Sequence, residues 1–276
     1  MDITKKKMSN TDYHAHEAVG SSLLKSIHLK SVLHAVSKEF TPSEAMNLGS
    51  AVHSLVLEPE VFHDDFAVAP KCDKRTKLGK AEYAEFLEGV GSKTVISADT
   101  LNTAEQMTFS VRNHPIANKI LSNGEAELSF FTNDSETGLQ LKCRPDYVNA
   151  GTLIDLKTTR DGSFDGFSKQ CGNLAYIIQA AFYLDVYNAA NETNLKDFFI
   201  ICVENSAPYA VSTYKLDELQ IEAGRKMYRR ALNNYAAYLE EKEIVGEEKA
   251  KTLYGYENDI VSLSIPYYFF DQIDIG

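Results

Sequence analysis

Hydrophobic side chains recur at helical spacing through most of the first 122 residues. The clearest helix start is Thr41-Pro42-Ser43-Glu44, which supplies a cap, a proline at the first helical position and a glutamate at the third, as in a capping box. Ala45, Leu48 and Val52 continue the apolar face of this helix, and Pro59 ends it. Further helices in this part are predicted to begin at Leu23, Lys80, Ala98 and Pro115.

The pattern then changes to period two. Residues 125–133 alternate between apolar and polar side chains, which predicts a strand. Residues 139–159 predict two more strands, joined by a tight turn at Asn149-Ala150-Gly151. A polar loop at 160–168 leads into a helix predicted from Cys171 to Ala190. The last predicted elements are strands at 197–203 and 209–214 and a long helix at 216–242.

This order of elements predicts an α/β fold with a central mixed β-sheet flanked by helices. We expect a single domain over residues 1–276, with a mainly helical part at 1–122 and a core at 123–215. A helix and a tail at 216–276 complete it, and the aromatic-rich segment 260–275 is expected to dock as a strand or loop.

Composition narrows the class of protein. With 44% hydrophobic and 24% charged residues, the chain has the balance of a globular protein. No run approaches the length of a transmembrane helix, and no apolar core follows the N-terminal lysines as it would in a secretory signal. The four cysteines form no C-x-x-C pair, which argues against a zinc or iron–sulfur site and favours free thiols in a cytoplasmic protein.

The charge distribution adds a second limit. A net charge of −11 argues against a protein that coats nucleic acid by bulk electrostatics. It leaves room for an enzyme with a local basic channel. A cluster of basic residues within ten positions could form one: Lys71, Lys74, Arg75, Lys77 and Lys80.

Residues 139–159 carry the main candidate chemistry. Side chains two apart on a strand share a face, so Asp155 and Lys157 project together, and Asp146 comes alongside when the two strands pair. Two carboxylates and an amine that converge in this way are costly to bury without partners. They are also what a divalent metal ion and a hydrolytic water need. On spacing alone, a surface ion pair between Asp155 and Lys157 explains the hairpin equally well.

Further polar positions accompany the hairpin. Gln179 and Tyr183 lie four apart on the following predicted helix and therefore share a face. His53 lies on the helix after Thr41, where a lone histidine is more often a packed residue than a ligand. Glu127 lies on the preceding strand and faces away from its apolar side, as does Glu125, and the pattern alone does not choose between the two acids.

These residues also carry a resemblance. Arg144-Pro145-Asp146 followed by Asp155-Leu156-Lys157 is the PD-(D/E)xK nuclease pattern. Gln179-x-x-x-Tyr183 resembles the QxxxY motif of RecB-type nucleases, and His53 within the segment 48–53 resembles their N-terminal histidine motif. Together with Lys74–Lys80, these segments resemble the C-terminal nuclease domain of the exonuclease VIII (RecE) family of phages and prophages over about residues 12–215.

The resemblance implies a fold and an activity. The fold would have a restriction-endonuclease-like PD-(D/E)xK core. The activity would be a Mg²⁺-dependent 5′-to-3′ exonuclease on linear double-stranded DNA, which leaves 3′ single-stranded overhangs for annealing recombination. A RecT-like single-strand annealing protein as partner and a ring-shaped tetramer are implied as well.

Roles for the acids and the histidine follow from the same resemblance. Asp146 and Asp155, with the backbone carbonyl of Leu156, would hold Mg²⁺ through hard oxygen ligands. His53 matches the additional metal-ligand position of the family, and its imidazole suits Mn²⁺, so Mn²⁺ should also support activity. Glu127 would orient water or bind a second ion.

Lys157 would position and deprotonate the attacking water or stabilise the charge that develops on the phosphate. Gln179 and Tyr183 would hold the scissile strand or support Lys157. The candidate DNA contacts are Arg75, Lys77, Lys80, Arg144, Thr158 and Thr159.

Two other classes of function stay open on the sequence. The first is another nuclease of the same superfamily, either an endonuclease or a single-strand nuclease. The second is a degenerate nuclease fold that only binds DNA or a recombination partner. Digestion of closed circular and linear DNA separates these readings.

Overall fold

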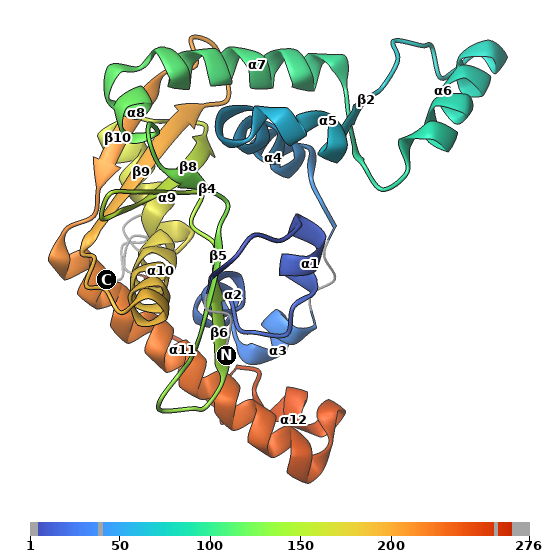
Figure 1. Ribbon diagram of the computed structural model, residues 1–276. Coiled ribbons are helices and arrows are strands. Elements are labelled where there is room, and N and C mark those ends of the chain that lie inside the picture. The colour runs from blue at the N-terminus through green and yellow to red at the C-terminus, as the bar shows by residue number, and fades with distance from the viewer. Residues whose placement is uncertain (1–4, 38–40, 257–258, 267–276) are drawn as a thin grey trace, which may run out of the picture.

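The computed structural model describes residues 5–37, 41–256 and 259–266, and its centre is a five-stranded sheet (Figure 1). The strands are β4 (Glu125–Ala126), β7 (Tyr147–Asn149), β8 (Thr152–Thr159), β9 (Asp197–Glu204) and β10 (Val211–Lys215). They lie in the order β10-β9-β8-β7-β4, in which β8 and β9 run parallel and the other neighbours antiparallel. The predicted mixed sheet is therefore confirmed.

One face of this sheet is covered by α4 (Glu44–Leu57) and α7 (Ala98–Asn113), which pack against each other. Ile154 and Leu156 of β8 point to this side and share a buried core with Val52 of α4. Removal of these side chains from water stabilises the fold and fixes α4 beside β8. This contact is what brings the polar residues of α4 to the hairpin.

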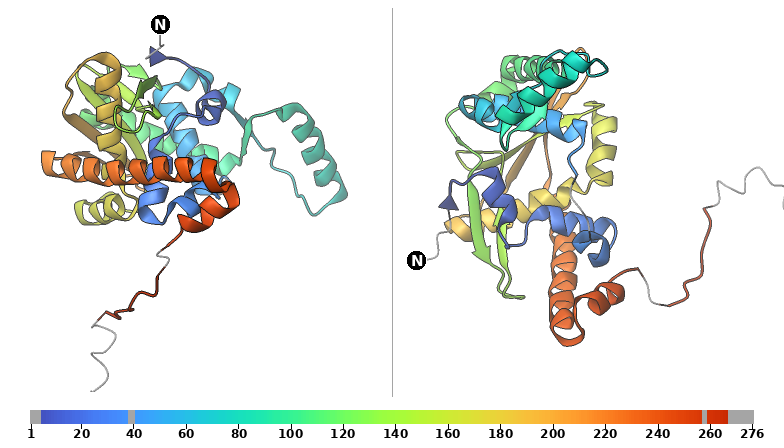
Figure 2. Two further views of the ribbon diagram at one scale, coloured as in Figure 1. Left: turned by 90° about the horizontal axis from the view of Figure 1, so that it is seen from below. Right: turned by 90° about the vertical axis from the view of Figure 1, so that its right-hand side faces the viewer.

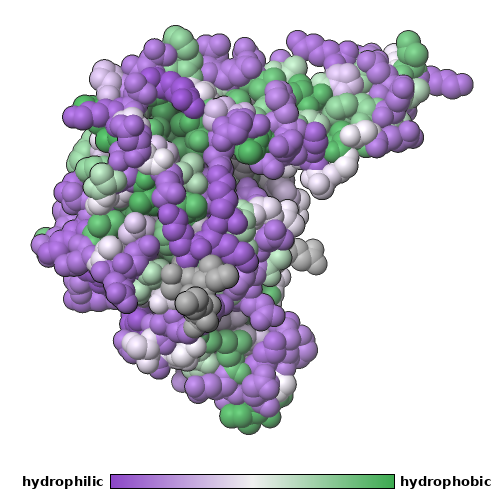
Figure 3. Space-filling model, viewed as in Figure 1, coloured by the Kyte–Doolittle hydropathy of each residue, from purple (hydrophilic) through white to green (hydrophobic). Residues whose placement is uncertain are grey.

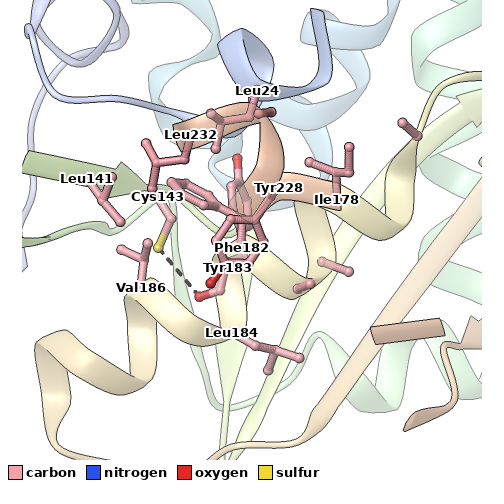
Figure 4. Close-up of a cluster of buried hydrophobic side chains, with 14 of the residues drawn as sticks. Leu24, Leu141, Cys143, Ile178, Phe182, Tyr183, Leu184, Val186, Tyr228 and Leu232 are labelled. Carbon is pink, nitrogen blue, oxygen red and sulfur yellow. Dashed lines mark hydrogen bonds between the residues drawn. The ribbon is translucent and has the colours of Figure 1, made fainter. Parts of the chain in front are cut away.

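The opposite face is covered by α10 (Tyr176–Asn191), which packs in turn against α11 (Glu218–Val245). Leu153 of β8 belongs to the core on this side. Because side chains alternate along a strand, Asp155 and Lys157 share the side of Leu153 and face α10. Figure 4 shows part of this core, whose buried members include Leu24, Ile178, Phe182, Leu184 and Leu232.

A second, antiparallel sheet is formed by β1 (Lys5–Lys6), β5 (Ser129–Asn133) and β6 (Gln140–Cys143), in the order β1-β5-β6. The single strand predicted over 125–133 is therefore wrong. Glu127 has φ 53°, a left-handed conformation that breaks the pleat. It sends β4 to the central sheet and β5 to the second one.

Other boundaries also differ from the sequence predictions. Pro145 separates β6 from β7, since proline donates no ladder hydrogen bond. The expected helix 171–190 is two helices, because Ala175 takes a left-handed conformation before α10. The first of the two is α9 (Phe164–Asn173), capped by Ser163, which replaces the end of the expected loop 160–168.

Several helix starts also differ from the predicted positions. α4 begins at Glu44 because the hydroxyl of Ser43 accepts from the backbone N–H of Met46, so Pro42 precedes the helix. The helix expected from Lys80 begins earlier, at Lys77. The remaining helices are α1 (Asn10–Ala15), α2 (Ser21–Leu29), α3 (Val32–Val36), η1 (Pro59–Val61), α5 (Phe62–Asp65), α8 (Pro115–Ile120) and α12 (Glu247–Leu253).

A helical arm projects from the body (Figures 1 and 2). The parallel strands β2 (Phe66–Val68) and β3 (Thr94–Ile96) form its base, and α6 (Lys77–Val90) forms its outer part. Figure 3 shows the molecular surface hollowed beneath the arm. We refer to residues 69–93 as the arm.

The C-terminal segment does not dock in its described part. Residues 259–266 form no helix or strand and run away from the body (Figure 2), with Ile260 and Leu263 fully or almost fully exposed. The rest of the segment predicted to dock, 267–275, lies outside the described residues. Within the described ranges, no helix combines the length and the apolarity needed to cross a membrane.

Candidate active site

The β7–β8 hairpin brings two acids together. Tyr147 pairs with Ile154, so the register places Asp146, just before β7, beside Asp155 on β8. The turn at Asn149-Ala150-Gly151 lies where the sequence predicted it, with positive φ at Ala150 and Gly151. The hairpin therefore has the geometry that the motif requires.

Asp155 is held from two sides in the interior. It is 1% exposed, and its Oδ2 lies 2.6 Å from the Nζ of Lys157. Its Oδ1 accepts a hydrogen bond of 2.7 Å from Nε2 of Gln179 on α10. Burial alone would lower the pKa of Lys157, but the charges of Asp155 and Asp146 raise the pKa above its usual range, so the ammonium stays protonated.

A second group of potential ligands lies next to this pair. Within the described part of the chain, His53, Glu127 and Asp146 each offer a ligand atom, and these atoms lie within 4.8 Å of one another. Nδ1 of His53 is 3.6 Å from Oδ2 of Asp146, which also accepts a 2.6 Å bond from the backbone N–H of Leu156. Asp155 lies outside this group of mutually close atoms; one of its oxygens lies against Lys157 and the other accepts from Gln179.

The tautomer of His53 follows from its partner. Its Nε2 lies 2.6 Å from the backbone oxygen of Leu156, and a carbonyl can only accept, so Nε2 carries the proton. In the neutral imidazole, the other ring nitrogen, Nδ1, is then the one with a lone pair, and it faces Asp146. A histidine in this state is ready to act as a nitrogen ligand.

The electrostatics of the group fit a cation. Burial, followed by the charge of Asp146, raises the pKa of Glu127 to about 8. Burial also raises the pKa of Asp146; the facing His53 opposes the rise and Asp155 adds to it. The raised pKa values show that the surroundings of these crowded carboxylates hold too little positive charge to stabilise their ionised forms. A divalent ion bound by the oxygen and imidazole ligands would supply that charge.

An open cleft of about 800 Å³ leads to these residues. Its walls are the N-terminal segment 7–14, α4 with the residues up to Phe66, and the base of the arm at Ser92 and Thr94. His53, Glu127 and Asp146 line the cleft, as does Tyr183. A ligand in the cleft can therefore reach the acidic group.

Comparison with known proteins places the chain in a family. The family described as PDDEXK-like domain of unknown function (DUF3799) matches residues 22–251. This chain belongs to that PDDEXK-like family. The PD-(D/E)xK fold predicted from Asp146, Asp155 and Lys157 is thereby confirmed. A comparison with curated proteins finds no match.

A solved structure shows the same fold. A protein from Eubacterium rectale, provisionally named an exonuclease, superposes with a TM-score of 0.60 at 14% identity, over 97% of this chain and 99% of that one. A phage-related exonuclease from Haemophilus somnus covers 84% of this chain and 99% of that one at 14% identity, but its TM-score of 0.36 carries no argument.

Tyr183 of this PDDEXK-like chain stands between the core and the cleft. It is 8% exposed, lies beside the core residues in Figure 4, and its backbone oxygen receives the thiol of Cys143 at 3.8 Å. Burial raises the pKa of its phenol well above the ordinary value, so the hydroxyl stays neutral. Tyr183 can therefore donate a hydrogen bond to a ligand in the cleft.

Arg144 lines the cleft, but its donors are used within the chain. Its Nε donates to Ser129 Oγ at 2.8 Å, and its outer nitrogens donate to Asn10 Oδ1 and the backbone oxygen of Met8. Its guanidinium lies 4.1 Å from the ring centroid of Tyr13. Arg144 thus ties the N-terminal segment to β5 and the site.

The two threonines after Lys157 differ in their surroundings. Thr158 is half-buried and faces α4 near Gly49. Thr159 is buried, and its hydroxyl lies 3.0 Å from the backbone oxygen of Asp161 and 2.8 Å from Oε1 of Gln170. Thr159 therefore holds the loop after β8.

The basic residues of the predicted DNA contact lie on the arm, away from the hairpin (Figure 1). Lys77 and Lys80 are exposed on the first turn of α6. Arg75 is exposed as well and pairs with Asp73 at 3.0 Å. The structure does not bring these cations to the acidic group.

Two residues near the site were not predicted from the sequence. Lys25 of α2 donates from Nζ to Oε1 of Gln179 at 3.0 Å. The ring of Tyr176, three residues before Gln179, lies 5.5 Å from Nζ of Lys25 and 5.1 Å from Nζ of Lys157. Tyr176 could have been found from its spacing on α10, but Lys25 belongs to no motif and lies on a distant helix.

Proposed function

We propose that this chain is a metal-dependent exodeoxyribonuclease that degrades linear double-stranded DNA in the 5′-to-3′ direction. Mg²⁺ would be its ion, and Mn²⁺ would substitute for it. One observation carries the proposal: His53, Glu127 and Asp146 converge beside the Asp155–Lys157 pair and line an open cleft. The membership of a PDDEXK-like family and the exonuclease name of the Eubacterium rectale protein support it.

The ion would be held by Asp146, Glu127 and His53, with Asp155 and the carbonyl of Leu156 as further oxygen ligands. When bound, it supplies Lewis-acid charge for phosphodiester hydrolysis. Asp146 is fixed by the backbone N–H of Leu156, so one carboxylate oxygen stays oriented toward His53. This preorganisation lowers the cost of assembling the ligands.

Lys157 acts in this proposal as a fixed positive charge. Its ammonium stays protonated beside Asp155, so it can donate to the attacking water or to a phosphate oxygen whose charge grows in the transition state. Gln179 keeps Asp155 in place. Tyr183, whose neutral hydroxyl can donate a hydrogen bond, lines the cleft and is suited to hold the scissile phosphate.

DNA beyond the scissile phosphate would meet the arm. Arg75, Lys77 and Lys80 are exposed there and would contact phosphates, so binding should weaken as salt rises. Thr158 is the remaining candidate for a backbone contact near the acids. Because the donors of Arg144 and the hydroxyl of Thr159 are engaged inside the chain, we assign both to positioning the site.

The biological setting follows the same resemblance. We propose that the enzyme acts in the cytoplasm at DNA ends beside a single-strand annealing protein of the RecT type, and that it assembles as a ring tetramer. Mass measurement in solution tests the ring, and co-purification with the annealing protein tests the partnership.

Polarity and end dependence are tested with labelled substrates. Linear duplex is labelled at one 5′ or one 3′ terminus and compared with closed circular DNA of the same sequence, in Mg²⁺ and then in Mn²⁺. The proposal predicts early release of the 5′ label and intact circles. Cut circles would establish an endonuclease, digestion of single strands alone a single-strand nuclease, and no cleavage with either ion would overturn the proposal.

A further inference from the structure

A chain of hydrogen bonds links α2 to the catalytic hairpin. Nζ of Lys25 donates to Oε1 of Gln179 at 3.0 Å, and Nε2 of Gln179 donates to Oδ1 of Asp155 at 2.7 Å. The other oxygen of Asp155 lies 2.6 Å from Nζ of Lys157. Side chains of α2, α10 and β8 are therefore linked in one network that ends on the Asp155 carboxylate.

The donor-to-acceptor direction of these hydrogen bonds is fixed at both ends of the series. An ammonium group has only donors, and an ionised carboxylate only accepts. The amide of Gln179 has one end of each kind, so its oxygen must face Lys25 and its nitrogen must face Asp155. Without Lys25, the amide is oriented from the Asp155 end alone.

Lys25 occupies this place at an electrostatic cost. Burial and the nearby Lys157 lower the pKa of Lys25 to about 8, while Asp155 and Asp146 act in the opposite direction. Its bond to Gln179, which is 6% exposed, and the ring of Tyr176 at 5.5 Å offset part of this cost. A lysine whose ammonium had no partner inside the protein would extend it into water.

We infer that Lys25 is a positioning residue of the active site, which orients the amide of Gln179 so that Gln179 holds Asp155 against Lys157. This inference rests on the proposed nuclease function. Lys25 acts through Gln179, and its effect should appear in the catalytic step and in the coupling between these two side chains.

Kinetics on linear duplex DNA with Mg²⁺ test the role. Lys25→Met should lower kcat about tenfold to a hundredfold with little change in KM, the effect expected of a misplaced catalytic group. Lys25→Arg keeps a donor and should recover most of the rate. Lys30→Met, an exposed lysine at the end of the same helix, should match the wild type. A raised KM with unchanged kcat would show that Lys25 contacts DNA instead, and would overturn the inference.

A double-mutant cycle in thermal unfolding gives a readout that needs no cleavage. The cycle compares the shift in melting temperature that Lys25→Met causes in two backgrounds, with chelator present. If Lys25 acts through Gln179, the shift in the wild type should differ from the shift in Gln179→Leu. Equal shifts in both backgrounds would contradict action through Gln179. If the wild type fails to cleave DNA while the coupling is present, the proposed function fails and the contact between Lys25 and Gln179 stands.

Discussion

Glu127 should destabilise the metal-free protein, because its carboxylate is partly removed from water and is also crowded by Asp146. Folding raises its pKa from the ordinary 4.5 to about 8. A raised pKa means that the folded state holds a proton that the unfolded state has released, so stability falls as the pH rises through this window. Glu127→Gln, which mimics the protonated acid, removes that loss.

The size of the effect follows from the shift. At pH 7.5 the full shift corresponds to an upper bound of about 4 kcal/mol. Because Glu127 keeps part of its side chain in contact with water, we expect the destabilisation to be about half of this upper bound, or about 2 kcal/mol. For a chain of 276 residues this raises the melting temperature by about 3 °C.

Thermal unfolding with chelator, at pH 7.5 and pH 5, measures the prediction. The gain of Glu127→Gln should shrink to below about 1 kcal/mol at pH 5, close to the unfolded pKa. Glu125→Gln is the matched control, since its side chain is 63% exposed and pairs with Lys5 at the surface. The reasoning is refuted if Glu127→Gln melts at or below the wild type at pH 7.5, or if both variants behave alike. The same pair separates the two acids that the sequence left open, since nucleotide release should fall with Glu127→Gln alone.

Four further substitutions test the packing and the site. Gly224→Ala should lower the free energy of unfolding by about 1–3 kcal/mol, because the added Cβ would overlap the backbone of α10. Gly89→Ala lies in open space on α6 and should raise the free energy of unfolding by about 0.5 kcal/mol. Thermal unfolding measures both. Arg229 lowers the pKa of Asp134 to about 2. Asp134→Asn should therefore reduce the free energy of unfolding by about 2 kcal/mol at pH 7, and the difference from the wild type should vanish as the pH falls through 4 toward 2. Chemical unfolding measures this difference. Lys157→Met should reduce nucleotide release from linear duplex at least about a hundredfold, and a smaller loss would assign Lys157 to the fold.

The sequence predicted the central sheet and the hairpin well, because both depend on local patterns. Alternation and the Asn149-Ala150-Gly151 turn determine which faces meet, and the register of β7 and β8 follows from them. The split at Glu127 and the break at Ala175 were missed, because a left-handed residue other than glycine is held by its tertiary surroundings.

Side-chain partners depend on packing that a single sequence does not display. Arg144 belongs to the motif, but its bonds to Asn10 and Met8 exist because the N-terminal segment folds back over β5. Lys25 reaches Gln179 only because α2 packs beside α10. Motif spacing can find residues that share an element and leaves unseen those that arrive from distant helices.

The central claim is that the group of His53, Glu127 and Asp146 binds the ion on which DNA cleavage depends. Asp146→Asn keeps an oxygen for the backbone N–H of Leu156 and removes a buried charge, so the variant should fold and melt at or above the wild type in chelator. The decisive measurement is nucleotide release from linear duplex DNA with Mg²⁺ by the wild type and Asp146→Asn side by side. The account predicts release by the wild type and none above background by the variant; equal release by both, or none by the wild type, would contradict it.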